Sequence, residues 1–243
     1  AGDNINGKNG GTGWSGAWDE ASNEFKISIT GLTYTDSQNN DLLTSGNAIL
    51  RTTGSGLETA ARSTSSAFSG QDIWVGALVR AEAGSNQMQV RMRGTVGDSW
   101  TRFRSKQDEI VLFSNNSGSN ESGSDIKGSA AVPDNTIFLV MQLERGTAAG
   151  GNDTLNAWVN PDVGVSSPNN FDGSGSLDTQ GNIGDLSEIR LFASTQASGG
   201  DRFMDEVRVG TSFQDVAPIP EPNAIALVVM VGAIGVAVRR RSR

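Results

Sequence analysis

The sequence contains no cysteine and no histidine. Without cysteine the chain has no disulfide framework, no thiol nucleophile and no thiolate metal site. Without histidine it has no Ser-His-Asp triad, no imidazole base and no histidine-bound zinc or haem. An enzyme built on this sequence would therefore depend on carboxylates, lysine, tyrosine or a metal held by carboxylates.

Basic residues are also scarce. Lys and Arg number 19 against 27 Asp and Glu, which gives a net charge of −8 over 243 residues. This balance argues against nucleic acid as a partner, because phosphate neutralisation needs clustered Lys and Arg. Four arginines lie in the last 21 residues, which hold no acid, so the first 222 residues carry a charge of −12. The chain is thus an acidic body followed by a short basic tail.

The tail has three parts in a fixed order. Residues 220–222 are Pro-Glu-Pro, which cannot continue a helix or a central strand. Residues 224–238 carry no charge, and at about 1.5 Å per residue they predict a short transmembrane helix. The basic cluster that follows should stay in the cytoplasm, which places the acidic body outside it. This cluster consists of Arg239, Arg240, Arg241 and Arg243.

Pro220, Glu221 and Pro222, followed by the apolar segment and the arginine cluster, resemble the PEP-CTERM sorting signal of Gram-negative bacteria. The resemblance implies export, an inner-membrane-anchored precursor, and processing by an exosortase, a membrane transpeptidase. It also implies a mature protein at the cell surface or in an extracellular matrix of exopolysaccharide or biofilm. A plain single-span anchor with a proline-rich stalk is the alternative. Because no export signal is visible from Ala1 onward, we expect a truncated or processed N-terminus.

Apolar residues in the body recur with period two, which predicts β-strands. This alternation occurs at 24–30, 87–93, 187–192 and 203–209. Nearly continuous apolar runs predict central strands at 73–79 and 137–143, and shorter candidates lie at 48–53, 99–104, 109–113 and 154–159. Turn-rich spacers separate them at 6–13, 114–125, 146–153 and 166–176. We therefore expect an all-β antiparallel sandwich of the jelly-roll type.

The segments Gly10 to Trp18 and Met204 to Phe213 resemble the two ends of the concanavalin A/laminin-G-like jelly-roll domains of bacterial surface proteins. The resemblance implies such a β-sandwich for the body. The expected organisation is a domain at 1–216, a proline-rich linker at 217–223, a transmembrane helix at 224–238 and a basic tail at 239–243.

We expect a non-catalytic structural protein of the surface or matrix, with exopolysaccharide or its own copies as partners. The alternatives are a carbohydrate-binding lectin-like module and a self-assembling fibre or layer subunit. A glycoside hydrolase is disfavoured, because the retaining reaction needs two carboxylates about 5–5.5 Å apart. Asp205 and Glu206 are adjacent, and adjacent strand residues point to opposite sheet faces.

Two kinds of ligand contact are predicted from residue type. Trp100 and Trp158 alternate with polar neighbours and are candidates for stacking on a sugar, whereas Trp74 is expected in the core and Trp14 and Trp18 at the sandwich edge. A structural calcium would need roughly six to eight hard oxygen ligands, which Asp-bearing loops supply, although Asp also forms ordinary turns. The calcium candidates are Asp153, Asp162, Asp172 and Asp178, and no other cofactor is expected.

Overall fold

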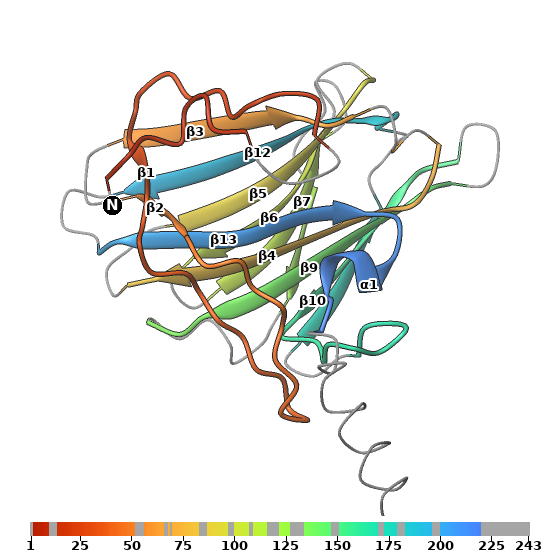
Figure 1. Cartoon of the computed structure of the whole chain (residues 1–243). Coiled ribbons are helices and arrows are strands. Elements are labelled where there is room, and N and C mark those ends of the chain that lie inside the picture. The colour runs from red at the N-terminus through yellow and green to blue at the C-terminus, as the bar shows by residue number, and fades with distance from the viewer. Residues whose placement is uncertain are drawn as a thin grey trace, which may run out of the picture.

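The computed structural model describes most of the acidic body. The described residues are 2–9, 14–51, 56–65, 68, 70–82, 87–96, 100–106, 109–115, 122–126, 134–146, 151–169, 173–178, 183–195 and 200–219. Their strands form two antiparallel sheets, one behind the other in Figure 1. The fold is therefore all-β, and within these residues the helical content is limited to α1 (Phe213–Val216) and a single 3₁₀ position.

The two sheets have seven and six strands. In spatial order the seven-stranded sheet contains β1 (Phe25–Ile27), β2 (Ile49–Arg51), β13 (Arg202–Gly210), β4 (Ile73–Ala81), β9 (Ile137–Glu144), β10 (Thr154–Val159) and β11 (Gly173–Asp178). The six-stranded sheet contains β3 (Gly56–Ser63), β12 (Leu186–Thr195), β5 (Gln87–Gly94), β6 (Trp100–Lys106), β7 (Glu109–Asn115) and β8 (Ser122–Ile126). Neighbours in both sheets pair antiparallel.

The period-two pattern found most of these strands. Each of the alternating and apolar ranges overlaps an observed strand, and the range 154–159 coincides with β10. Side chains at alternate positions of β4 and β9 fill the space between the sheets, together with Met88, Val90 and Met92 of β5. The prediction of an antiparallel two-sheet fold is confirmed by this arrangement.

Two strands lie where the sequence predicts turns. The predicted spacer 114–125 contains most of β8, and the predicted spacer 166–176 contains the start of β11. Gly, Ser and Asp dominate both strands, so they show no apolar alternation. Each is held by a complete backbone ladder instead, β8 against β7 and β11 against β10. The strand β3 was likewise not predicted.

The seven-stranded sheet is buried on its outer face as well. A second apolar cluster contains Leu32, Leu42, Phe138 and Phe213, and it joins the segment between β1 and β2 to α1. Figure 1 shows this segment crossing in front of β13 and β4. Trp74, which the sequence predicts in the core, is partly buried against this second cluster on the outer face of the sheet.

The predicted tail lies beyond this description. Within the described ranges no helix has the length and apolarity that crossing a membrane requires. Residues 220–243, which include the Pro-Glu-Pro motif, the apolar segment and the arginine cluster, fall outside the described residues.

Candidate functional site

A cleft of about 520 Å³ at one edge of the sandwich brings chemistry-bearing side chains together. It arises because β2 pairs with β13 only at Arg202, Phe203 and Met204. Beyond Met204 no described strand continues on that side of β13, so the two sheets part there. Ile49, Val207 and Val209 form the apolar floor of the opening, where they are partly buried against the main core.

Two tryptophans and one arginine form one wall of the cleft. β3 is an edge strand of the six-stranded sheet, and Trp14 and Trp18 lie along its outer edge. Isolated bridges there join Trp14 to Thr64 and Asp19 to Ala61. Their ring centroids are 6.1 Å apart at a tilt of 42°. The Arg62 guanidinium lies 4.7 Å from the Trp14 ring centre and 5.8 Å from that of Trp18. Packing and cation–π contacts hold this wall together.

Arg62 also ties the N-terminal segment to β3. Its Nε donates to the carbonyl of Gly16 at 2.9 Å, and its Nη2 donates to the Asn9 side chain at 2.7 Å. The residue is 5% exposed, and this burial lowers the pKa of its guanidinium from the ordinary value. Arg62 therefore lines the aromatic wall and also holds it in place.

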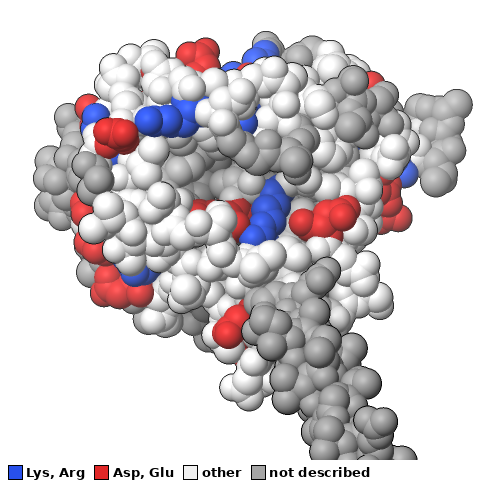
Figure 2. Space-filling view, viewed as in Figure 1, with Lys and Arg blue, Asp and Glu red and all other residues white. Residues whose placement is uncertain are grey.

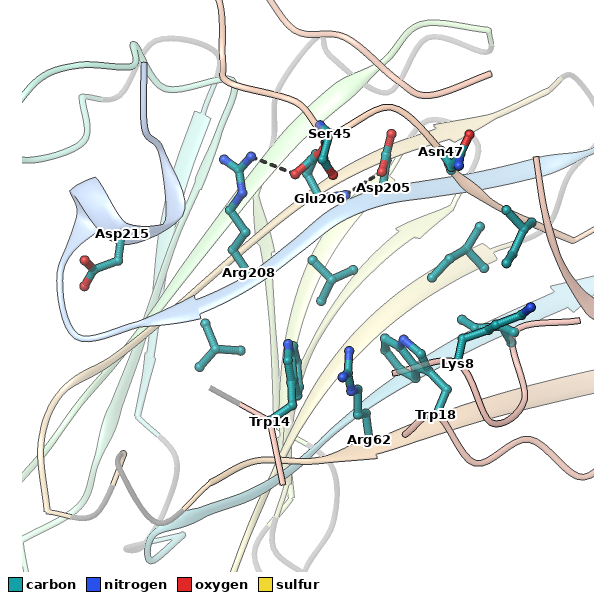
Figure 3. Close-up of a pocket in the computed structure, with 16 residues that line it drawn as sticks. Lys8, Trp14, Trp18, Ser45, Asn47, Arg62, Asp205, Glu206, Arg208 and Asp215 are labelled. Atoms are coloured by element: carbon teal, nitrogen blue, oxygen red, sulfur yellow. Dashed lines mark hydrogen bonds and ion pairs between the residues drawn. The ribbon is translucent and has the colours of Figure 1, made fainter. Parts of the chain in front are cut away.

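A charged group from β13 forms the opposite wall. Figure 3 shows Asp205, Glu206 and Arg208 across the opening from Trp14 and Trp18. Figure 2 shows acidic and basic side chains gathered at a hollow near the middle of this face. The two walls come from different sheets, so the cleft combines an aromatic side with a polar side.

A β-bulge brings the two adjacent acids to the same cleft. The register of β13 on β4 shifts between Asp205 and Arg208, and Glu206 has a φ of 50°. The alternation rule predicts these side chains on opposite sheet faces, but both bond the segment between β1 and β2, Asp205 at Leu32 and Glu206 at Ser45. The alternation rule applies to a regular pleat, and an extra residue with left-handed backbone interrupts it.

Both carboxylates are occupied by internal hydrogen bonds. Asp205 accepts the backbone N–H of Leu32 at 2.7 Å and that of Glu206 at 2.8 Å. Glu206 accepts from the backbone and hydroxyl of Ser45 on one oxygen and from Arg208 Nη2 at 2.7 Å on the other. These bonds attach the segment between β1 and β2 to β13, so both acids have a structural role.

The pKa values of the acids in this region shift in different directions. Burial raises the pKa of Asp205, against hydrogen bonds from Leu32 and Glu206 that favour its charged form. Burial would also raise the pKa of Asp215, but hydrogen bonds from Ser212 and Thr211 outweigh it and lower the value. Asp215 closes the capping box of α1, which explains why it is held charged.

The predicted calcium residues are placed apart from the cleft. Asp153 is fully buried and accepts from Arg145 at 3.1 Å and from the backbone of Ile183 at 2.9 Å. Asp162 accepts from the hydroxyl of Ser37 at 2.6 Å and from Asn169. In the part of the chain that the structure describes, no three acidic side chains gather as a metal site. Asp178 ends β11, and Asp172 lies outside the described residues.

The two predicted sugar-contacting tryptophans lie on different sheets. Trp158 is half-buried on the outer face of the seven-stranded sheet, where it stacks on Trp74 with centroids 5.4 Å apart and planes at 18°. Trp100 begins β6, opposite Arg93 and Asn115 in the register. The structure does not bring these two residues together.

Sequence reasoning missed Arg62 in the aromatic wall, and Glu206 and Arg208 in the polar wall. These residues carry no recognisable motif, and their placement depends on a cation–π contact and on a bulge. Trp14 and Trp18 were expected at the sandwich edge, and that is where they lie. The short spacing of the two tryptophans was the sequence signal for their wall, but it did not indicate which residues lie across the cleft.

No protein-family model matches the sequence, and neither does any curated protein. Solved structures similar to this chain include the receptor-binding domain of botulinum neurotoxin type G, at 8% identity and a TM-score of 0.46 over 79% of this chain. The receptor-binding domain of botulinum neurotoxin D is similar at 8% identity and a TM-score of 0.47 over 86%. The matches cover 45% and 48% of those chains, so this chain spans less than half their length.

Proposed function

We propose that this chain is an exported, non-catalytic protein of the cell surface or extracellular matrix, sorted and processed by an exosortase. The observation that carries the proposal is the order of Pro-Glu-Pro at 220–222, the apolar segment 224–238 and the terminal arginine cluster. An extended motif next to a membrane segment is accessible to a membrane enzyme, because proline keeps it out of helices and central strands. The body would be a concanavalin A-like jelly roll, a proposal supported by its two antiparallel sheets.

Replacement of the motif tests the sorting step. The double variant Pro220→Ala, Pro222→Ala should keep its full C-terminus when expressed with its exosortase, whereas the unchanged chain should lose mass at this end. Pro168→Ala is the matched control, because this proline lies in a body loop far along the sequence from the motif. If the double variant is processed like the control, the tail is a plain membrane anchor.

A saccharide-binding role is the second candidate, and the cleft is the observation that favours it. Trp14 offers an aromatic face next to the buried Trp18, while Arg208, Glu206 and Asn47 offer polar groups across the opening. Sugar rings present apolar faces and hydroxyl edges, so an aromatic wall opposite a polar wall fits their chemistry. Exopolysaccharide would then be the partner that retains the mature protein in the matrix.

A glycan array with the full chain tests this second role. If the cleft binds saccharide, Trp14→Ala should lower the affinity at least about tenfold, the loss expected when a stacking contact is removed. Trp158→Phe is the control outside the cleft, because phenylalanine retains much of the contact with Trp74. Loss of binding in the control alone would move the site to the outer face of the seven-stranded sheet. Absence of binding to any glycan would leave the structural role.

The non-catalytic assignment is supported by the state of the cleft acids. A general acid or nucleophile needs a carboxylate that reaches substrate, and the oxygens of Asp205 and Glu206 are engaged with Leu32, Ser45 and Arg208. Sugar-release assays with Asp205→Asn and Glu206→Gln would check the assignment. Self-assembly through open strand edges is the further alternative, and electron microscopy of the purified chain would show fibres or layers.

A further inference from the structure

Two arginines face each other inside the sandwich, away from the cleft. Arg51 of β2 and Arg202 of β13 are direct partners in the antiparallel register. They are two positions along from Ile49 and Met204, which pack in the main core, so their side chains also enter the space between the sheets. Arg51 is 1% exposed and Arg202 is 0% exposed. The strands that carry them lie side by side in Figure 1.

Within the part of the chain that the structure describes, these guanidiniums are almost without hydrogen-bond partners. The Nε and Nη1 atoms of Arg51 and all three side-chain nitrogens of Arg202 are buried and unbonded. The closest acidic contact is Glu58 of β3, whose Oε1 lies 4.0 Å from Arg51 Nη2. Buried donors without acceptors and buried charges without counter-charges are both strongly unfavourable.

The two charges also disfavour each other. Desolvation is the main reason that the pKa of Arg202 is lowered, and the neighbouring Arg51 lowers it further. The carboxylate of Asp201 opposes this shift, but its effect is smaller than that of Arg51. Because guanidinium stays protonated in proteins, deprotonation does not relieve the repulsion.

The described acids near this pair do not bond the buried nitrogens. Glu82 directly follows β4, and its Oε2 accepts the backbone N–H of Asp201 at 3.1 Å. Asp201 acts on Arg202 through its charge, and Glu58 approaches only Arg51. The donors of Arg202 and the Nε and Nη1 of Arg51 therefore remain without a described acceptor.

We propose that Arg51 and Arg202 together bind one small monovalent anion, a chloride or a carboxylate of the size of formate, between the two sheets. A single anion accepts from both guanidiniums at once and offsets their mutual repulsion. Water would satisfy the donors but would not offset the repulsion. Ile49 and Met204 on the inner side make the site dry, which strengthens the attraction and limits the size of the anion.

Thermal unfolding of the full chain in different anions tests the proposal. A ligand that binds only the folded state raises the melting temperature with its concentration. Replacing isethionate by chloride from about 1 to about 100 mM, at constant ionic strength, should raise Tm by about 2–4 °C. A parallel series with formate distinguishes the two candidate anions, because a site shaped for carboxylate will respond more strongly to formate than to chloride.

The double variant Arg51→Met, Arg202→Met provides the decisive comparison. Methionine retains a long flexible apolar stem, and a buried charged cluster replaced by apolar residues often keeps its stability. This variant should unfold at a temperature independent of chloride and formate. The control is Arg190→Met, which removes an arginine paired to Glu188 at 2.6 Å on the six-stranded sheet and should keep the anion response.

Two results would overturn the proposal. One is a wild-type Tm that follows the general salt order, with fluoride and sulfate more stabilising than chloride, since that order reflects exclusion from the surface. The other is an anion response that persists in the double variant. If the double variant does not fold, bromide-soaked crystals of the wild-type chain decide: an anomalous peak between Arg51 and Arg202 supports the site, and its absence contradicts it.

Discussion

Asp205 accepts a hydrogen bond of 2.7 Å from the backbone N–H of Leu32, although 173 residues separate the two in the chain. The bond joins β13 to the segment between β1 and β2, which covers the outer face of the seven-stranded sheet. Leu32 and its neighbours in that segment form the second apolar cluster. One buried carboxylate thus connects the edge of the cleft to the layer that closes the sheet.

Removal of this carboxylate should destabilise the domain. Asp205→Ala leaves the buried Leu32 N–H without an acceptor, so we expect a loss of about 1–3 kcal/mol. Asp205→Asn should cost less, because an amide oxygen still accepts the bond. Urea unfolding measures both. Asp41→Ala is the control, since the exposed Asp41 bonds only to the nearby Thr35 hydroxyl among the described contacts. Equal losses for Asp205→Ala and the control would refute the connecting role.

The closeness of Gly94 to another backbone segment predicts a strong effect of a single methyl group. A Cβ at Gly94 would lie 1.7 Å from the carbonyl oxygen of Ile183, so β5 or the neighbouring segment must move. Gly94→Ala should therefore destabilise by about 1–3 kcal/mol or more. Gly16→Ala, where no atom lies within 4 Å of the added carbon, should be near neutral. Melting temperatures of the two variants provide the measurement, and similar values would contradict the packing.

The stack of Trp158 on Trp74 predicts a role in stability for the outer cluster. Trp158→Ala removes an aromatic pair and part of the cover over Trp74, and we expect a loss of about 2–3 kcal/mol. Trp158→Phe should retain much of the contact. Near-ultraviolet circular dichroism should lose intensity in the Ala variant, because the paired indoles no longer couple. An unchanged stability would instead favour a free, ligand-facing Trp158.

Two hydrogen-bonded acids predict how stability changes in acid. Burial would raise the pKa of Asp36, but hydrogen bonds from Asn40, Val163 and Gln38 outweigh it and lower the value below 3.8. The pKa of Asp215 is lowered in the same way. Their charged forms therefore contribute stability above 3.8, and that contribution is lost as the pH falls through the lowered values.

The test is urea unfolding from neutral pH to below 3.8, the ordinary value for these acids. Asp36→Asn should reduce the slope of stability against pH in the acid range. Asp205 has the opposite sign, because its raised pKa gives stability that declines as the pH rises through that value. Asp205→Asn should therefore steepen the acid loss. An unchanged slope in Asp36→Asn would show that other groups control the acid transition.

The candidate cleft shows where prediction from sequence ends. Trp14 and Trp18 were expected at the sandwich edge because they flank a short Ser-Gly-Ala turn. Glu206 was assigned to the face opposite Asp205 by the alternation rule, and the bulge overrides that rule. At the bulge Glu206 bonds Ser45, which lies 161 residues away in the chain. Local sequence carries no information about such a contact.

By itself the sequence determined the class of the protein and its chemistry. Period two along 87–93 and 203–209 is a local property of a pleated chain with one face on a core, so it predicts strands without knowledge of partners. The absence of Cys and His is likewise a property of composition, and it excludes triads and zinc wherever the chain folds. The order of the tail motif, on which the sorting proposal is based, is also visible directly in the sequence.

Only the tertiary structure decided which strands meet and what lies between them. It placed Trp14 of the N-terminal segment across from Glu206, and it set Arg51 against Arg202 with most of their buried nitrogens unbonded. It also made strands of the Gly- and Ser-rich β8 and β11, which need a neighbouring ladder to form. Strand pairing, burial and charge balance are relations between distant residues. They contribute to the free energy only after folding has brought those residues together.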